Sequence, residues 1–467
     1  MPGDGVVALS RDGRVASVTP DYEITMQGDS FVGRPSTTYA ATVRADELWR
    51  DGVTGSGIGV ALLDTGVSDH PDLAGRVVAS ADLTTEGTFT DSYGHGTFLA
   101  GLITGTDNSP KPGTSGVAPG AHLVSVKVAG ADGDTTLGQV LYGLQLIDAS
   151  SERYNVRVVV MALAGPATDG PDPLILAVER LWADGLVVVA AAGNSGPTAG
   201  SVASPGVDPY VVTVGGTDEG GTTSMADDTV PEWSARGPSV FGLPKPDLVA
   251  PGKSLVSLRV PGSTIDEANP GARVGDSYFR GTGTSMSAAV AAGGVALLLE
   301  RDPSLTPDEV KGRLLAGARP IAEADPNAAG RGGLDVVAAS EARGPVANAE
   351  LPAFPVRGKT DSPADPFGPG RRSFDWFASP VGPDRWLARG WAHRAWSGTE
   401  FVARGWAARG WAGSDWSARG WADSEWAGRG WAARGWAARG WAARGWSSSE
   451  WSARGWAGVE WAAERWK

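Results

Sequence analysis

The sequence predicts an α/β protein in which a mostly parallel central sheet carries helices on both faces. Apolar β-type runs alternate with stretches of helical spacing between residues 41 and 343, the pattern of strands joined by crossover helices. Several runs are continuously apolar, which is typical of strands buried on both faces. We predict strands over 59–64, 122–128, 156–161, 185–191, 210–214 and 247–251, and helices over 97–103, 137–149, 174–183 and 285–300.

Composition narrows the function classes. The formal net charge of −13 argues against a nucleic-acid partner, and the absence of cysteine removes disulfides, thiolate metal sites and a cysteine nucleophile. No apolar run approaches the roughly 18 residues of a membrane span. The first residues, MPGDGVVALSRDG, lack the basic region and apolar core of a signal peptide.

Three residues could together carry acyl transfer. Asp64 stands in Leu-Asp-Thr-Gly after a predicted strand, His95 in Gly-His-Gly-Thr, and Ser285 in Gly-Thr-Ser-Met-Ser at the start of the long helix. Each alone has a structural explanation: a turn, a core histidine or a helix cap. Together they supply an orienting acid, a general base and a hydroxyl nucleophile.

Their order along the chain separates the known triad scaffolds. Chymotrypsin-type enzymes run His, Asp, Ser, and nucleophile-elbow hydrolases run Ser, acid, His, whereas subtilisin runs Asp, His, Ser. With these flanking residues the chain resembles the subtilisin-like (subtilase) serine proteases over about 300 residues. The resemblance implies that Asn194, in Ala-Ala-Gly-Asn-Ser-Gly, donates to the oxyanion beside the Ser285 backbone N–H.

The resemblance also implies substrate-binding segments. Residues 161–166 look like the strand that lines the primary pocket, with Val160, Ala162 and Ala164 where the family commonly has Asn, Ser and Gly. Main-chain pairing with substrate survives such changes, because strand addition uses backbone groups. The predicted substrate-binding residues are Val128, Ala129, Gly130, Ala162, Leu163, Ala164 and Gly193.

Two further expectations come from the family. No cofactor is required for catalysis, but a structural calcium ion is possible, with Asp72 in His-Pro-Asp-Leu as a ligand. The segment from Gly13 to Glu23 looks like the end of an inhibitory propeptide, of which only the tail is present. We therefore expect Met1 to lie inside a longer precursor and the enzyme to be secreted or at the cell surface.

The chain ends in a repeat with an aromatic residue at every fifth position. All but three of the 20 tryptophans lie after residue 375. A period of five fits neither helix nor strand. We predict four parts: a propeptide remnant and maturation segment (1–40), a catalytic domain (41–343), a Pro/Gly-rich linker (344–384) and Trp-rich pentad repeats (385–467).

The predicted function is a monomeric serine endopeptidase that acts on protein or peptide substrates. Its repeats would attach to a cell-envelope or glycan surface by stacking of their aromatic rings, or else form a disordered extension. Two alternatives remain open. One is a catalytically impaired subtilase domain that serves as a surface adhesion protein. The other is an intracellular processing protease, which is supported only by the missing signal peptide.

Overall fold

The computed structural model describes residues 19, 21–27, 35–107, 115–167, 172–224, 226–322, 324–344 and 346–349, with two short strands near the C-terminus. Residues 1–18 and nearly all of the predicted linker and Trp repeats lie outside the described residues. The chain divides into two compact units, of which the second, Tyr22–Gly170 with Leu181–Pro352, carries the site.

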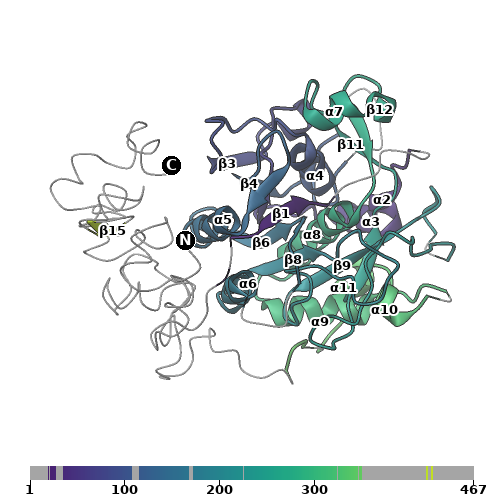
Figure 1. The fold of residues 1–467 in the computed structure, drawn as a ribbon. Helices are drawn as coiled ribbons and strands as arrows, with labels where there is room; N and C mark the ends of the chain where they lie inside the picture. Colours follow the sequence, from purple (N-terminus) through teal and green to yellow (C-terminus); the bar gives the residue numbers. More distant parts are fainter. Residues whose placement is uncertain are drawn as a thin grey trace, which may run out of the picture. The chain divides into compact units, whose positions relative to one another are not determined.

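The helices and strands follow the chain in an alternating order (Figure 1). The strands are β1 (Glu23–Met26), β2 (Gly59–Asp64), β3 (Val77–Asp82), β4 (His122–Lys127), β5 (Asp134–Thr136), β6 (Val156–Met161), β7 (Leu163–Ala164), β8 (Val187–Ala191), β9 (Val212–Thr217), β10 (Leu248–Pro251), β11 (Leu255–Leu258), β12 (Arg273–Val274), β13 (Tyr278–Gly281), β14 (Ser417–Ala418) and β15 (Ala422–Asp423). The helices are α2 (Tyr39–Thr42), α3 (Ala45–Arg50), α4 (His95–Thr104), α5 (Leu137–Ser150), α6 (Pro173–Ala183), α7 (Thr264–Ala268), α8 (Thr284–Arg301), α9 (Pro307–Gly317), α10 (Pro326–Ala329) and α11 (Val336–Glu341), with 3-10 turns η1 (Pro71–Leu73) and η2 (Pro270–Ala272).

A seven-stranded parallel sheet forms the centre, in the order β10-β9-β8-β6-β2-β4-β3. Strands β2 and β8 are buried along their whole length, as their continuous apolar runs require. The predicted α/β fold is confirmed, and all six predicted strands are present, displaced by at most a few residues.

Helices cover both faces of this sheet. Helix α5 contacts β2 and β4 on one side, and α4 and α8 pack together on the other (Figure 1). Small side chains let α8 run through the core: it is buried from Thr284 to Leu299, and a Cβ on Gly293 would lie 2.6 Å from the Val117 side chain. Among the described helices, none combines the length and apolar content that crossing a membrane would need.

The site lies at one edge of the sheet because the carboxyl ends of parallel strands meet there. Asp64 ends β2, Ala162 follows β6, and Asn194 comes shortly after β8. These three strands are neighbours in the order β8-β6-β2. The fold therefore gathers positions about 130 residues apart at one end of adjacent strands.

Candidate active site

Asp64 and His95 form a buried pair. Asp64 is 1% exposed and His95 2% exposed. The His95 Nδ1 atom lies 2.9 Å from Asp64 Oδ1 and 3.0 Å from Oδ2. Because an ionised carboxylate only accepts hydrogen bonds, Nδ1 carries the proton in the neutral imidazole, and Nε2 has the lone pair that a general base needs.

The loop before His95 is held by a second buried acid, Asp91. Its Oδ1 accepts from Thr65 Oγ1 at 2.8 Å and from Gly94 N at 2.6 Å, and its Oδ2 accepts from Thr97 N at 2.7 Å. Burial raises the pKa of Asp91, while these hydrogen bonds favour its charged form. Asp91 thus fixes the start of α4, a role that the sequence analysis missed.

Gly96 allows this close approach. A Cβ on Gly96 would run into the Gly66 carbonyl oxygen and come within 3.1 Å of Asp64 Oδ1. The Gly96 N–H instead donates to Thr65 Oγ1 at 2.9 Å. Glycine after His95 is therefore a steric requirement for the pair.

Ser285 is the second residue of α8 and lies at the same edge. Its hydroxyl is within hydrogen-bonding distance of two carbonyl oxygens, that of Ala162 at 3.1 Å and that of Gln27. Its backbone N–H points to the same Gln27 oxygen at 3.3 Å. Since Leu63 pairs with Met161, Ala162 lies next to the end of the Asp64 strand.

Asn194 contacts Thr284, the residue that precedes Ser285. Its Oδ1 accepts from Thr284 N at 2.9 Å and from Thr284 Oγ1 at 3.0 Å, which fixes the orientation of the amide. Its Nδ2 is buried and has no hydrogen-bond partner among the described residues. Gly193, predicted to contact substrate, donates its N–H to Thr284 Oγ1 at 3.1 Å.

A segment of the chain itself lies as a strand in this site. β1 pairs antiparallel with β5 on one side and β7 on the other, forming a three-stranded sheet. The Gln27 N–H donates to the Ala162 carbonyl at 3.1 Å. Ile24 is fully buried and Met26 is 6% exposed, while the alternate residues Glu23 and Thr25 face solvent.

The predicted substrate-binding residues fall into two groups. Leu163 and Ala164 form β7 and pair with β1, and Ala162 accepts two hydrogen bonds. Val128, Ala129 and Gly130 lie before β5, so the strand that pairs with β1 begins a few residues later than the predicted segment. Val128 is buried and its N–H donates to Asp64 O at 2.8 Å.

Asp72, the predicted calcium ligand, is a fully buried residue of η1. Its carboxylate accepts a hydrogen bond from Tyr278 OH at 2.8 Å. Within the described ranges, no three or more acidic, histidine or cysteine side chains gather closely enough to hold a metal ion. Residues 108–114 of the neighbouring loop are not described, and calcium stays a prediction.

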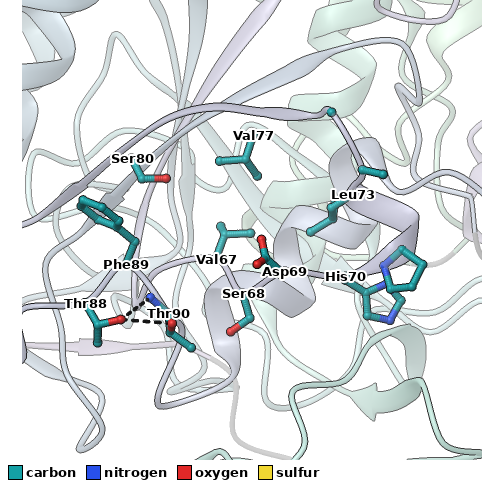
Figure 2. Close-up of a pocket in the computed structure, with 13 residues that line it drawn as sticks. Val67, Ser68, Asp69, His70, Leu73, Val77, Ser80, Thr88, Phe89 and Thr90 are labelled. Atoms are coloured by element: carbon teal, nitrogen blue, oxygen red, sulfur yellow. Dashed lines mark hydrogen bonds between the residues drawn. The ribbon is translucent and has the colours of Figure 1, made fainter.

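A hollow of about 670 Å³ lies beside η1 and the edge strand β3 (Figure 2). Its lining includes Val67, His70, Leu73, Val77 and Phe89. None of the four predicted catalytic residues lines it. No residue of β1, β5 or β7 is among its lining residues.

Comparison with known proteins identifies the family of the chain. A profile of the subtilase family, Peptidase S8, matches residues 55–338, more than half of the chain. The chain belongs to the subtilase family. It is therefore a serine-type endopeptidase, and its substrates are proteins or peptides.

Relatives of this subtilase include several bacterial proteases. It is 42% identical over 301 residues to serine protease AprX of Bacillus subtilis (strain 168), which covers 62% of the chain and 68% of the relative. It is 35% identical over 272 residues to subtilisin Savinase of Lederbergia lenta, covering 58% and 87%. An alkaline protease of Alkalihalobacillus alcalophilus is 33% identical over 311 residues, covering 67% and 70%.

Proposed function

We propose that this subtilase cleaves peptide bonds through an acyl-enzyme on Ser285, with His95 as base and acid and Asp64 as the orienting carboxylate. The Ser285 hydroxyl attacks the carbonyl carbon, and its proton moves to His95 Nε2. His95 then protonates the leaving amine as the carbon–nitrogen bond breaks. A water molecule then attacks the ester in the same way, with His95 taking its proton. The carboxylic acid product leaves, and His95 returns the proton to the Ser285 oxygen.

The oxyanion of each tetrahedral intermediate would lie between Asn194 Nδ2 and the Ser285 N–H. Two observations support this assignment: the unpartnered Nδ2 beside Ser285, and the Ser285 N–H aimed at a carbonyl oxygen. Fixed donors at this position stabilise charge that develops only in the transition state. The start of α8 adds the positive end of its dipole.

The first substrate of this site would be the bond between Gln27 and Gly28. The observation that carries this proposal is the Gln27 carbonyl, bonded to the Ser285 hydroxyl and facing its N–H, at the end of a strand paired on both sides. Residues before this bond would act as an inhibitory segment until it is cut. The predicted boundary within residues 1–40 then lies after Gln27.

Labelling with a fluorophosphonate tests whether Ser285 is the nucleophile, and N-terminal sequencing tests whether the enzyme cleaves itself after Gln27. Wild type should react with the label and begin at Gly28, whereas Ser285→Ala should do neither. Ser287→Ala is the matched control, because Ser287 is a buried serine one half-turn along the same helix and should leave both results intact. Cleavage after Gln27 in purified Ser285→Ala would overturn the proposal.

We also propose that the Trp repeats attach the enzyme to an envelope or glycan surface outside the cytoplasm, as the family resemblance suggests. The sequence supports this proposal, because aromatic rings at every fifth position, interleaved with arginine and glycine, suit ring stacking. Deleting residues 385–467 should lower sedimentation with cell envelopes and leave peptidase activity intact. Equal sedimentation of the shortened protein would remove this idea.

The bonded Asp64–His95 pair and the oxyanion donors favour an active enzyme over a catalytically impaired adhesin.

A further inference from the structure

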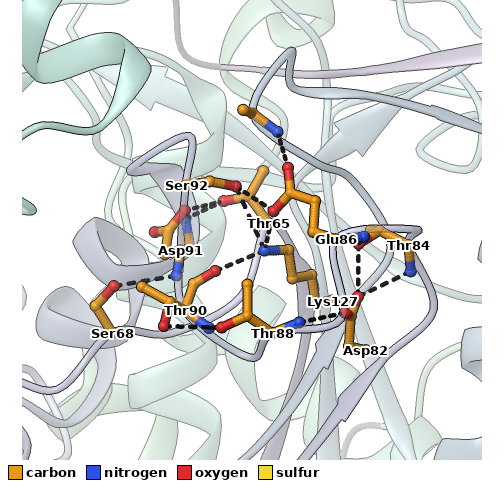
Figure 3. Close-up of polar contacts among 12 residues, drawn as sticks. Thr65, Ser68, Asp82, Thr84, Glu86, Thr88, Thr90, Asp91, Ser92 and Lys127 are labelled. Atoms are coloured by element: carbon orange, nitrogen blue, oxygen red, sulfur yellow. Dashed lines mark hydrogen bonds and ion pairs between the residues drawn. The ribbon is translucent and has the colours of Figure 1, made fainter.

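The loop that leads into β5 is tied to a glutamate from a distant segment (Figure 3). Glu86 Oε1 accepts the Ala131 N–H at 2.7 Å, and a Cβ on Gly130 would lie 2.7 Å from the same oxygen. Ala131 comes three residues before β5, the strand that pairs with β1. Glu86 thus contacts the segment that sets the position of β5.

The other carboxylate oxygen of Glu86 faces a fully buried lysine. Lys127 Nζ lies 2.7 Å from Glu86 Oε2 and 2.6 Å from the Thr90 carbonyl, and the Ser92 hydroxyl donates to Glu86 Oε2 at 2.6 Å. The Lys127 ammonium, with Ser92 and Ala131, holds the pKa of Glu86 below its ordinary value. The Glu86 carboxylate is therefore charged at neutral pH, and Lys127 Nζ is its buried ion-pair partner.

The same cluster adjoins the catalytic pair. Lys127 stands opposite Asp64 in the parallel register of β2 and β4. Ser92 lies three residues before His95, and a Cβ on Gly133 would come within 2.6 Å of the Tyr93 ring. The segment that carries His95 and the segment that leads into β5 are thus packed together, and Glu86 bonds to both.

The loop that carries Glu86 is itself fixed. Asp82 Oδ1 accepts from Thr84 N at 2.8 Å, and Asp82 Oδ2 accepts from Thr88 N at 2.9 Å (Figure 3). These bonds close the loop on either side of Glu86 and anchor it to the end of β3. The carboxylate is therefore held by a closed loop on a sheet strand.

We propose that Glu86 is a positioning residue that holds the substrate-pairing strand β5 in register with the Asp64–His95 pair. The proposal rests on the proposed function, in which substrate adds as a strand to β5 and β7. Without the carboxylate, the Ala131 N–H and the buried ammonium both lose a partner, and the loop before β5 shifts. Substrates that pair with β5 suffer most, whereas a substrate limited to the residue before the scissile bond reaches only Ala162, Ser285 and Asn194.

The test compares two substrates with the same p-nitrophenyl leaving group in the matured enzyme, which begins at Gly28 and keeps the rest of the chain. One is succinyl-Ile-Thr-Met-Gln ester, which copies residues 24–27, and the other is acetyl-Gln ester. Rates are divided by the concentration of serine that fluorophosphonate labels. The quantity measured is the ratio of kcat/KM for the long ester to that for the short ester.

We expect Glu86→Ala to lower this ratio about tenfold, chiefly through KM, as the loss of a charge-assisted bond at a binding strand predicts. Thr85→Ala, at the exposed neighbouring position, should leave the ratio within about twofold of wild type. The double variant Glu86→Gln with Lys127→Met keeps an acceptor for Ala131 and removes the buried charge, so it should recover most of the ratio. If Glu86→Ala fails to fold, the double variant Glu86→Ala with Lys127→Met carries the same test, because it removes the acceptor for Ala131 and the buried charge together and should lower the ratio as Glu86→Ala does.

Two results would overturn the inference in distinguishable ways. An unchanged ratio in labelled Glu86→Ala enzyme, with only a lower melting temperature, would reduce Glu86 to a structural residue and leave the proposed function standing. Turnover of either ester by Ser285→Ala would overturn the proposed function and the role of Glu86 with it.

Discussion

Replacing Asp228 by asparagine should stabilise the folded subtilase above pH 7. Asp228 is 3% exposed, and neither carboxyl oxygen has a hydrogen-bond partner among the described residues. Burial, followed by the charges of Glu219, Asp227 and Asp218, raises the pKa of Asp228 from 3.8 to about 7, and Arg319 opposes this only in part. The structure thus holds a carboxylate that is costly to ionise.

The sign and size follow from proton linkage. In the unfolded chain this carboxyl loses its proton near pH 4, whereas the folded state keeps it to about pH 7. The folded state therefore binds more protons between these values, and stability falls as pH rises through this window. A difference of about three pKa units corresponds to a stabilisation of ~4 kcal/mol at most when the charge is removed. Burying the asparagine amide without a hydrogen-bond partner costs roughly 1–3 kcal/mol. The net gain in the free energy of unfolding at pH 8 is therefore about 1–3 kcal/mol.

Thermal unfolding from pH 4 to 8 measures this effect, with Ser285→Ala as the background to prevent self-digestion. At about 2 °C or more per kcal/mol, Asp228→Asn should melt several degrees higher at pH 8 and no higher at pH 4. Asp227→Asn is the matched control, since Asp227 is exposed, and should shift the melting temperature much less. Parallel curves for Asp228→Asn and its background between pH 4 and 7 would refute the reasoning.

Three further predictions concern the active site. Asn194→Leu should lower kcat by about 10²–10³-fold with little change in KM, because this is the loss in kcat when subtilisin loses one oxyanion donor. An unchanged kcat would show that Asn194 does not stabilise the oxyanion. Asp64→Asn should lower kcat by about 10⁴-fold, because His95 would then present the wrong tautomer, and kinetics at saturating substrate would reveal a milder loss if the pair is only structural. Gly165→Val should lower kcat/KM by roughly 10-fold or more for peptides whose fourth residue before the cleaved bond is isoleucine. The reason is that a Cβ on residue 165 would lie 3.3 Å from Ile24 Cγ1. If the variant cleaved peptides with isoleucine and with alanine at that position equally well, the prediction would be contradicted.

The central strands could be predicted because burial on both faces demands continuous apolar runs. Strand β2 and strand β8 satisfy that demand and were visible as such. The edge strand β3, Val77–Asp82, was missed because it is only half buried and its sequence mixes polar and apolar residues. An edge strand has one neighbour, so its composition is less constrained.

The candidate site residues were predicted for a different reason: short motifs surround them. Gly96 and Gly193 belong to those motifs, and Gly96 is required by the close approach of Asp64. Asp91 and Glu86 could not be found this way, because each acts through bonds to backbone amides whose proximity only the fold creates. The aspartate four residues before His95 was the one available signal, and acidic residues are common in loops.

The altered pocket strand need not weaken catalysis, because the contacts that matter there come from the backbone. The resemblance puts Ala162 where the family commonly has serine, and the group that acts here is the Ala162 carbonyl, which accepts both the Gln27 N–H and the Ser285 hydroxyl. Strand β7 likewise pairs with β1 through its main chain. Selectivity then falls to the alternate side chains of the bound strand, Ile24 and Met26, which are buried while their neighbours are exposed. A segment with that alternation both fills the groove and presents its last carbonyl to Ser285, so the features that would make β1 an inhibitor are the same ones that would make it a substrate.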